Sequence, residues 1–368
     1  MPSIAWLMAR SLKVAPPHIA QVNLAVKRRG YPSQKQFAAD VGPSLSTVKK
    51  FLKGEAIDYE NFRELCERLE LDWQSVVDLA TDETVVNTAA PLTGEIAAFN
   101  PSHPISHPMG FFGRSREINR SFGLLKRRPL QNIAIIGPRK SGKTSLLKHL
   151  AQLTLIPAVQ LRGDQNGDRL LHPEQYKWIF VDLQDPRLGT RDGLIKHLLS
   201  ALGVNIEHCD LEQFMDLMST HLQQPTVMLL DEIGSVLKRD SDLDDTFWES
   251  LRSLASNHSN GNLSFILTSH EHPTELASHT GHSSPFFNIF GYATNLGPLA
   301  ETDARALIGS SPIAFDAADI AWIIEQSECW PFLIQILCQY RLEALRNQET
   351  DDIWKAEGLQ QLEFYRRG

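Results

Sequence analysis

Long apolar runs, a signal-peptide pattern and paired cysteines are all missing from this sequence. No run approaches the ~18 apolar residues that a membrane span needs, so we expect no membrane insertion. The opening MPSIAWLMAR has a short apolar run, but no basic residue precedes it and no small-residue cleavage site follows, which favours an amphipathic helix. The four cysteines are scattered and form no CxxC pair, which favours a reducing, cytoplasmic location over a disulfide-stabilised secreted one.

An excess of positive charge is also missing. Lys and Arg number 36 against 44 Asp and Glu, for a net charge of −8, which argues against wholesale coating of nucleic acid or anionic membrane. We therefore expect any DNA contact to be local, through a basic face. No G-x-S-x-G elbow is present, and the 13 histidines show no closed zinc spacing. We therefore expect neither a hydrolase triad nor a histidine metal centre.

Composition divides the 368 residues into four segments, enough for two or three domains. Residues 1–80 contain short helical patterns, and residues 81–110 gather Pro, Ser, Thr, Asn and Gly as a linker does. In residues 111–300, β-branched runs alternate with helical segments, which predicts a mainly parallel, doubly wound α/β core. Residues 301–368 favour helix throughout. The strand candidates are NIAIIG, KWIFVDL, TVMLLD, LSFILTS and YATNLGPL.

The first strand candidate leads directly into a loop that matches G-x-x-x-x-G-K-[ST], and a helical segment follows. The glycines let backbone N–H groups converge on phosphate oxygens, Lys143 would reach the β and γ phosphates, and the Thr144 hydroxyl would hold Mg²⁺. The alternative is an ordinary glycine turn before a helix. The expected phosphate-binding residues are Gly137, Pro138, Arg139, Lys140, Ser141, Gly142, Lys143, Thr144 and Ser145.

A second motif, PTVMLLDEIG, ends a fully apolar strand candidate in two acids. Asp231 would position the metal's water shell, and Glu232 would polarise an attacking water. Strand ends often carry acids, so this motif alone is a weak sign of a metal site. Its presence in the same chain as a phosphate loop favours the functional interpretation. KWIFVDL falls between the two motifs in the sequence; an additional strand there, with Glu beside the strand-end Asp, resembles the ATP-hydrolysing branch of P-loop proteins.

FFGRSREINRSFGLL resembles the GR-x-x-E box that opens AAA+-related and STAND signal-transduction ATPases. The resemblance implies that Phe112, Gly113 and Arg114 form the wall of the base site. The alternative is the start of a basic amphipathic helix.

Two later stretches extend this resemblance. LSFILTSHEHP places Thr268, Ser269 and His270 where these families carry a polar sensor of the γ-phosphate. SECWPFLIQILC is similar to the start of the helical lid, which would put Trp330 and Pro331 against the base; a helix that simply begins with Pro, with Trp in the core, is the alternative. For Arg252 and Arg305 we expect solvated side chains and no arginine finger.

Near the N-terminus, SQKQFAADVGPSLSTVKKFLKG has the spacing of a helix-turn-helix. Residues 10–53 hold nine basic residues and one acid, whereas residues 54–80 hold two basic residues and eight acids. The segment resembles Cro/repressor-type domains and the N-terminal helix-turn-helix of bacterial conflict-system ATPases. Contact with double-stranded DNA and contact with a protein both remain open. The expected DNA-facing residues are Ser44, Ser46, Thr47, Lys49 and Lys50.

Together, these resemblances imply a cytoplasmic switch of the STAND or AAA+ kind that binds ATP or ADP with Mg²⁺ and hydrolyses slowly, in bacterial regulation or defence. We expect a homo-oligomer with ATP, and output through the N-terminal segment, self-assembly or an effector protein in trans. The alternatives are a DNA-dependent AAA+ ATPase of the transposition-regulator type, which assembles on DNA, and a nucleotide-gated transcription regulator.

Overall fold

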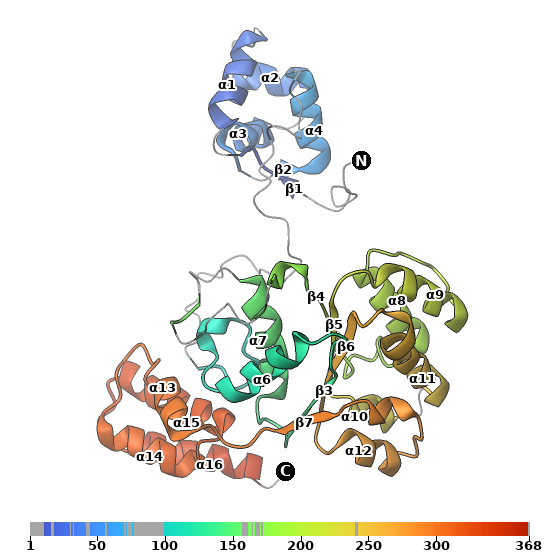
Figure 1. The fold of residues 1–368 in the computed structure, drawn as a ribbon. Coiled ribbons are helices and arrows are strands. Elements are labelled where there is room, and N and C mark those ends of the chain that lie inside the picture. The colour runs from blue at the N-terminus through green and yellow to red at the C-terminus, as the bar shows by residue number, and fades with distance from the viewer. Residues whose placement is uncertain are drawn as a thin grey trace. The chain divides into compact units, whose positions relative to one another are not determined.

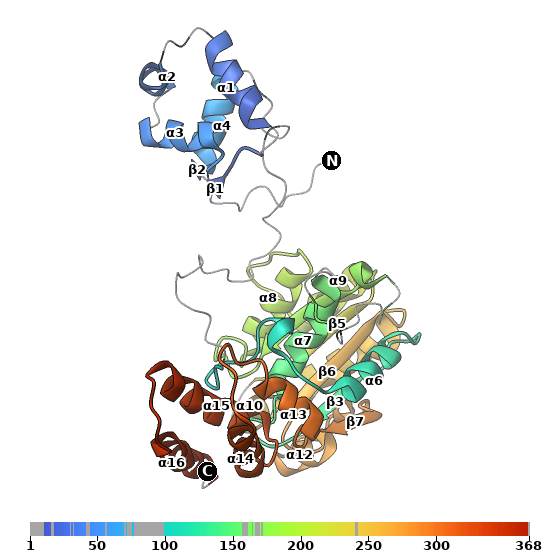
Figure 2. The same cartoon turned by 90° about the vertical axis from the view of Figure 1, so that its left-hand side faces the viewer.

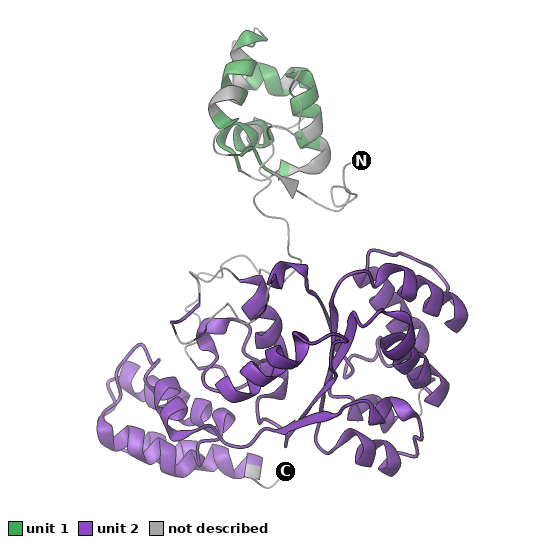
Figure 3. Ribbon diagram, in the orientation of Figure 1, with its two compact units in different colours: residues 1–95 green, residues 96–368 purple. Residues whose placement is uncertain are grey.

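The structure, a computed structural model, contains two compact units, residues 1–95 and 96–368 (Figure 3). Each unit has its own hydrophobic core. The described residues are 11–15, 18–29, 31, 33–41, 45–55, 57–69, 71, 76, 99–156, 161–163, 165, 170, 172–239 and 242–366.

The described residues of the first unit form four short helices packed around buried aromatic side chains. Phe51 and Phe62 meet edge to face, with ring centroids 5.3 Å apart. Residues 42–44, between α2 and α3, lie outside the described residues. The helix-turn-helix assignment depends on that turn and stays a prediction. The elements are β1 (Ser11–Leu12), α1 (Ile19–Arg28), α2 (Gln34–Val41), α3 (Leu45–Lys53), β2 (Ile57–Asp58) and α4 (Tyr59–Arg68).

A parallel five-stranded sheet forms the centre of the second unit, in the order β4-β5-β6-β3-β7 (Figure 1). All five strands expected from the sequence are present, which confirms the α/β core. β6 is the strand that separates β3 from β5, whereas β4, the strand between the two motifs in the sequence, lies at the edge. The strands are β3 (Ile133–Ile136), β4 (Lys177–Asp182), β5 (Thr226–Asp231), β6 (Leu263–Ser269) and β7 (Tyr292–Asn295).

Helices cover both faces of this sheet (Figures 1 and 2). Along β5, Met228 and Leu230 join the core shared with α8, α9 and α11, while Val227 and Leu229 join the core shared with α6 and α7. A strand buried on both faces has a continuous apolar sequence, as here. The covering elements are α6 (Ser115–Leu125), α7 (Lys143–Leu155), η5 (Pro173–Gln175), α8 (Arg191–Ala201), α9 (Leu211–His221), α10 (Gly234–Leu237), α11 (Asp245–Ser253), η6 (Leu254–His258), α12 (Pro273–His279) and η7 (Pro285–Asn288).

Four helices after the sheet form a smaller layer, which we call the lid. Its core is buried around residues such as Ile323, Leu337 and Trp354. The lid helices are α13 (Glu301–Ile308), α14 (Ala317–Ser327), α15 (Pro331–Arg346) and α16 (Ile353–Arg366).

The second half of the segment that the sequence assigns to a linker is packed structure. Phe99 is buried in the lid core, and the backbone N–H of Ile105 donates to the Ser145 hydroxyl at 3.1 Å. The short helix η3 (Pro108–Gly110) follows. Proline and small polar residues exclude a long helix here, but the apolar side chains of Phe99 and Ile105 still pack against the cores of the lid and of the sheet. We call residues 99–110 the strap.

Within the described residues, none of the helices is both long enough and apolar enough to cross a bilayer.

Candidate nucleotide-binding site

The loop after β3 has the backbone of an anion-binding turn. Lys140 and Gly142 both have positive φ, 65° and 94°. A Cβ on Gly137 would lie 2.8 Å from the Ser141 Oγ and 3.0 Å from the Leu296 carbonyl oxygen, so only glycine fits there. The Ser141 hydroxyl is buried and, among the described residues, has no hydrogen-bond partner. An orphaned donor in a glycine-rich loop at a helix N-terminus suits a phosphate oxygen.

Lys143 is the first residue of α7, and its side chain is only 3% exposed. Its Nζ donates to the carbonyl oxygens of Gly137 (3.0 Å) and Pro138 (3.1 Å) and lies 3.2 Å from Glu232 Oε1. A buried ammonium needs such oxygen partners. These contacts hold the Lys143 ammonium at the phosphate loop, next to Glu232 of the second motif.

Asp231 lies at the end of β5, and both of its carboxylate oxygens are hydrogen-bonded. The Thr144 hydroxyl donates to Oδ2 at 2.8 Å, and the Thr268 hydroxyl, from β6, donates to Oδ1 at 2.7 Å. Burial raises the pKa of Asp231, and the charges of Glu232 and Asp182 act in the same direction, against the two hydroxyl hydrogen bonds. A divalent cation beside these oxygens would favour the ionised carboxylate, so Thr144 and Asp231 fit Mg²⁺.

Glu232 is held in an unusual backbone conformation, with φ of 53°. Its N–H donates to the Thr268 hydroxyl at 2.7 Å. Since the same hydroxyl donates to Asp231, one side chain of β6 fixes both acids. The left-handed turn directs the Glu232 carboxylate towards Lys143.

The three sensor candidates have different surroundings. Thr268 contacts the two acids. The Ser269 hydroxyl donates to the Glu271 carbonyl oxygen and its own carbonyl accepts from the Gly137 N–H at 3.1 Å, so its side chain is engaged within its own turn. His270 lies at the surface with its Nε2 3.0 Å from Glu271 Oε1. Among the described residues, no group of three or more His, Cys, Asp or Glu side chains is placed to hold a metal ion.

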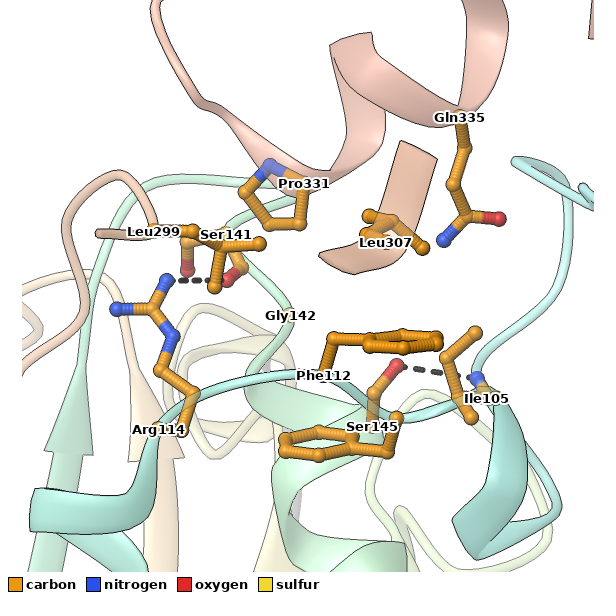
Figure 4. A pocket seen from close by; sticks show the side chains of 12 residues that line it. Ile105, Phe112, Arg114, Ser141, Gly142, Ser145, Leu299, Leu307, Pro331 and Gln335 are labelled. Carbon is orange, nitrogen blue, oxygen red and sulfur yellow. Dashed lines mark hydrogen bonds between the residues drawn. The ribbon is translucent and has the colours of Figure 1, made fainter. Parts of the chain in front are cut away.

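A cavity opens beside the phosphate loop, between the sheet and the lid (Figure 4). Phe112, Leu307 and Pro331 give it apolar walls, and the lining also includes Ile105, Gly110, Phe111, Arg114, Ser141, Gly142, Ser145, Leu299 and Gln335. Six residues expected at the base or phosphate site thus line one cavity: Phe112, Arg114, Ser141, Gly142, Ser145 and Pro331. Trp330 instead lines a second cavity, with Pro138, Arg139, Lys140, Phe332, Leu333 and Tyr365.

Arg114 joins the loop to the exit of β7. Its guanidinium donates to the carbonyl oxygens of Gly297, Pro298 (3.4 Å) and Ser141 (3.5 Å). Burial lowers the pKa of Arg114. Its position braces the cavity wall and leaves the base-facing surface to Phe112.

Gly113 permits the lid to approach. Its φ is 73°, and a Cβ there would lie 2.6 Å from Asp303 Oδ2 on α13. Glycine is therefore required at this position of the predicted box.

The remaining candidates do not line this cavity. Arg305 pairs with Glu301 at 2.7 Å along α13, and Arg252 lies in the last turn of α11. In the first unit, Lys49 and Lys50 are exposed on α3 and Thr47 is half-buried there. Ser44 and the side chain of Ser46 lie outside the described residues.

Sequence reasoning missed several residues of the cavity. Gln335 lies one helical turn after Pro331, so a helix that starts with Pro331 at the site would have indicated it. Ile105 belongs to the strap, where composition gives no signal of a site. Asn100, also in the strap, does not line the cavity but donates its backbone N–H to Gln335.

Comparison with known proteins identifies the domain. The AAA domain family matches residues 127–275, which include the phosphate loop, Asp231, Glu232 and Thr268. The ORC2 protein of Aeropyrum pernix, in ADPNP and ADP complexes, matches with a TM-score of 0.51 at 11% identity, over 72% of this chain and 71% of that one. The Walker-type ATPase of Pyrococcus abyssi matches with a TM-score of 0.48 at 19% identity, over 73% of this chain and 79% of that one. Cdc6p of Pyrobaculum aerophilum matches with a TM-score of 0.47 at 13% identity, over 68% and 66%.

No curated protein sequence matches the chain significantly. The likeness to ORC2 shows a shared fold. With the family match, the chain carries an AAA-type P-loop NTPase domain over residues 127–275.

Proposed function

We propose that this protein is an ATP-binding, slowly hydrolysing switch of the STAND or AAA+ kind, acting in bacterial regulation or defence. The observation that carries the proposal is a pair of contacts next to the lid-covered cavity: Lys143 Nζ lies 3.2 Å from Glu232 Oε1, and the Thr144 hydroxyl donates to Asp231 at 2.8 Å. Phosphates would lie on the loop and the base between Phe112 and the lid. Bound nucleotide would then contact both layers and favour a closed, assembly-competent form.

Hydrolysis would depend on Glu232. Its carboxylate lies beside the Lys143 ammonium, where an attacking water would be oriented towards the γ-phosphate. Thr144 and Asp231 would hold Mg²⁺, which when bound neutralises charge on the phosphate oxygens. The hydrogen bond from Glu232 N–H to Thr268 would keep this acid in place through turnover.

The test uses two substitutions with opposite expected effects. Lys143→Ala removes the buried cation and should abolish ATP binding. Glu232→Gln keeps the shape and removes a negative charge 3.2 Å from Lys143, so it should preserve or tighten ATP binding while slowing hydrolysis about 100-fold. Binding is measured by titration with ATP and turnover by phosphate release. Equal turnover in the Glu232→Gln protein would contradict the assignment of Glu232.

A second candidate is a DNA-dependent AAA+ ATPase that assembles on double-stranded DNA. The supporting observation is the exposed pair Lys49 and Lys50 on α3, within the basic part of the first unit. Duplex-stimulated ATPase activity would favour this function over a switch driven by a protein partner. A footprint confined to one short palindrome would instead favour a nucleotide-gated transcription regulator.

A further inference from the structure

The end of the base cavity away from the phosphate loop is formed by a lid side chain, Gln335 of α15. Gln335 lines the cavity beside Leu307 and the strap residue Ile105. Figure 4 shows its amide nitrogen directed towards Leu307 and its amide oxygen directed away. A polar group therefore stands at the end of a slot whose walls are mainly apolar.

The orientation of this amide is fixed by the strap. The backbone N–H of Asn100 donates to Gln335 Oε1 at 3.1 Å. Since the oxygen is engaged as an acceptor, the Nε2 hydrogens are the end presented to the cavity. Within the part of the chain that the structure describes, Gln335 Nε2 donates no hydrogen bond. Gln335 thus offers the cavity a hydrogen-bond donor that cannot be exchanged for an acceptor without breaking the bond to Asn100.

The walls next to Gln335 suit a planar ring. Phe112 lies across the slot from Leu307 (Figure 4). The guanidinium carbon of Arg162 is 3.9 Å from the Phe112 ring centroid, which holds the ring in place by a cation–π contact. A base stacked on Phe112, with its sugar towards the phosphate loop, would bring its outer edge to Gln335. That edge carries a ring-nitrogen acceptor in adenine and a ring N–H donor in guanine and hypoxanthine.

Building on the proposed nucleotide binding, we propose that Gln335 selects adenine nucleotides by donating an Nε2 hydrogen to the ring-nitrogen acceptor at the outer edge of the base. Asn100 acts as a positioning residue, because its N–H prevents the amide from turning its oxygen to the base. If the base carries an N–H at that edge, this N–H and the Nε2 hydrogen of Gln335 face each other as two donors, and neither finds an acceptor. A site discriminates more strongly against a ligand that leaves buried polar groups without hydrogen bonds than against one that differs only in size.

The test compares ATP with ITP, whose base carries oxygen in place of the amino group and therefore a ring N–H. Gln335→Glu keeps the side-chain shape and the acceptor for Asn100, but replaces the donor with a carboxylate. The added charge weakens all nucleotides alike, so the readout is the ratio of the ATP and ITP dissociation constants in Mg²⁺ buffer. We expect the preference for ATP to fall at least about 10-fold, the change that one hydrogen bond produces.

Two further variants make the result specific. Gln360→Glu places the same charge on an exposed position of α16 and should leave the ratio unchanged. Asn100→Pro removes the orienting N–H while keeping Gln335 and should partly relax the ratio. An unchanged ATP to ITP ratio in Gln335→Glu, with tight ATP binding by the wild-type protein, overturns the role of Gln335 alone. A wild-type protein that binds neither nucleotide overturns the proposed function as well.

Discussion

Asp231 combines burial with an acidic neighbourhood, and this has a consequence for stability. The pKa of Asp231 is raised, chiefly by burial. Between its ordinary value and the raised one, the folded protein binds more protons than the unfolded chain, so the free energy of unfolding decreases as pH rises through this window. The protonated Asp231 therefore contributes its full stabilisation of the folded protein only below the ordinary pKa of an aspartate.

Asp231→Asn removes this dependence because the amide does not ionise. In Mg²⁺-free and nucleotide-free buffer we expect the variant to melt higher than the wild type at neutral pH, and the difference to shrink as pH falls towards the ordinary aspartate pKa. Thermal melts across this range measure the effect. Glu249→Gln, which neutralises an exposed acid on α11, is the control and should change stability much less. A variant that melts lower at neutral pH would contradict the prediction.

At the same scale, residues whose chemistry is local could be singled out from the sequence. Lys143, Thr144, Asp231 and Glu232 come from two short motifs, and they lie together. The contacts of Thr268 with both acids could not be derived, because they require that β6 lie beside β5. The orientation of Gln335 likewise depends on a strap residue 235 positions earlier in the chain.

Among the elements, the last lid helix contacts the tip of the phosphate loop directly. The Lys140 ammonium lies 3.2 Å from the ring centroid of Tyr365 on α16 and 4.3 Å from that of Phe332 on α15. Burial lowers the pKa of Lys140, and the charge of Arg139 acts in the same direction. The lid therefore holds a cation that would otherwise be available to phosphate.

Tyr365→Ala should release Lys140 and tighten ATP binding by about threefold, because one cation–π contact no longer competes with the phosphates. Titration with ATP measures the change. Phe364→Ala is the matched control, since Phe364 is 68% exposed on the same helix. Weaker ATP binding in Tyr365→Ala would mean that the contact supports the bound form.

The elements themselves were largely predictable. Short β-branched or aromatic runs, alternating with helical segments, predict all five strands. The signal is plainest in β3 and β5, where burial on both faces requires a continuous apolar run. Spatial order was not readable from the strands alone, because β4 and β6 have similar apolar patterns and only packing puts β6 in the middle. The sequence indicates a linker where the strap lies, because single buried residues such as Phe99 do not form the periodic apolar pattern of a helix or strand.

For the whole molecule, the proposed functions differ in the assemblies they predict. A switch should be larger by mass measurement with ATP than with ADP, and a DNA-dependent ATPase should enlarge further only when duplex DNA is added with ATP. In the second case, Lys49→Glu/Lys50→Glu should remove the duplex response while leaving ATP binding intact, since each lysine that contacts phosphate adds to DNA affinity. Lys126→Glu/Arg127→Glu, exposed in the second unit, is the charge-matched control. The same mass in ADP, ATP and ATP with duplex would contradict both functions.

The anchoring of Phe99 also has a mechanical meaning. Phe99 lies four residues after Glu95, the last residue of the first unit, and is buried in the core of the lid. A load applied through the first unit would therefore be borne by the lid before it reached the sheet. Tension on the chain and closure of the lid would act on the same four helices. A pull on the first unit would therefore change the affinity of the second unit for nucleotide.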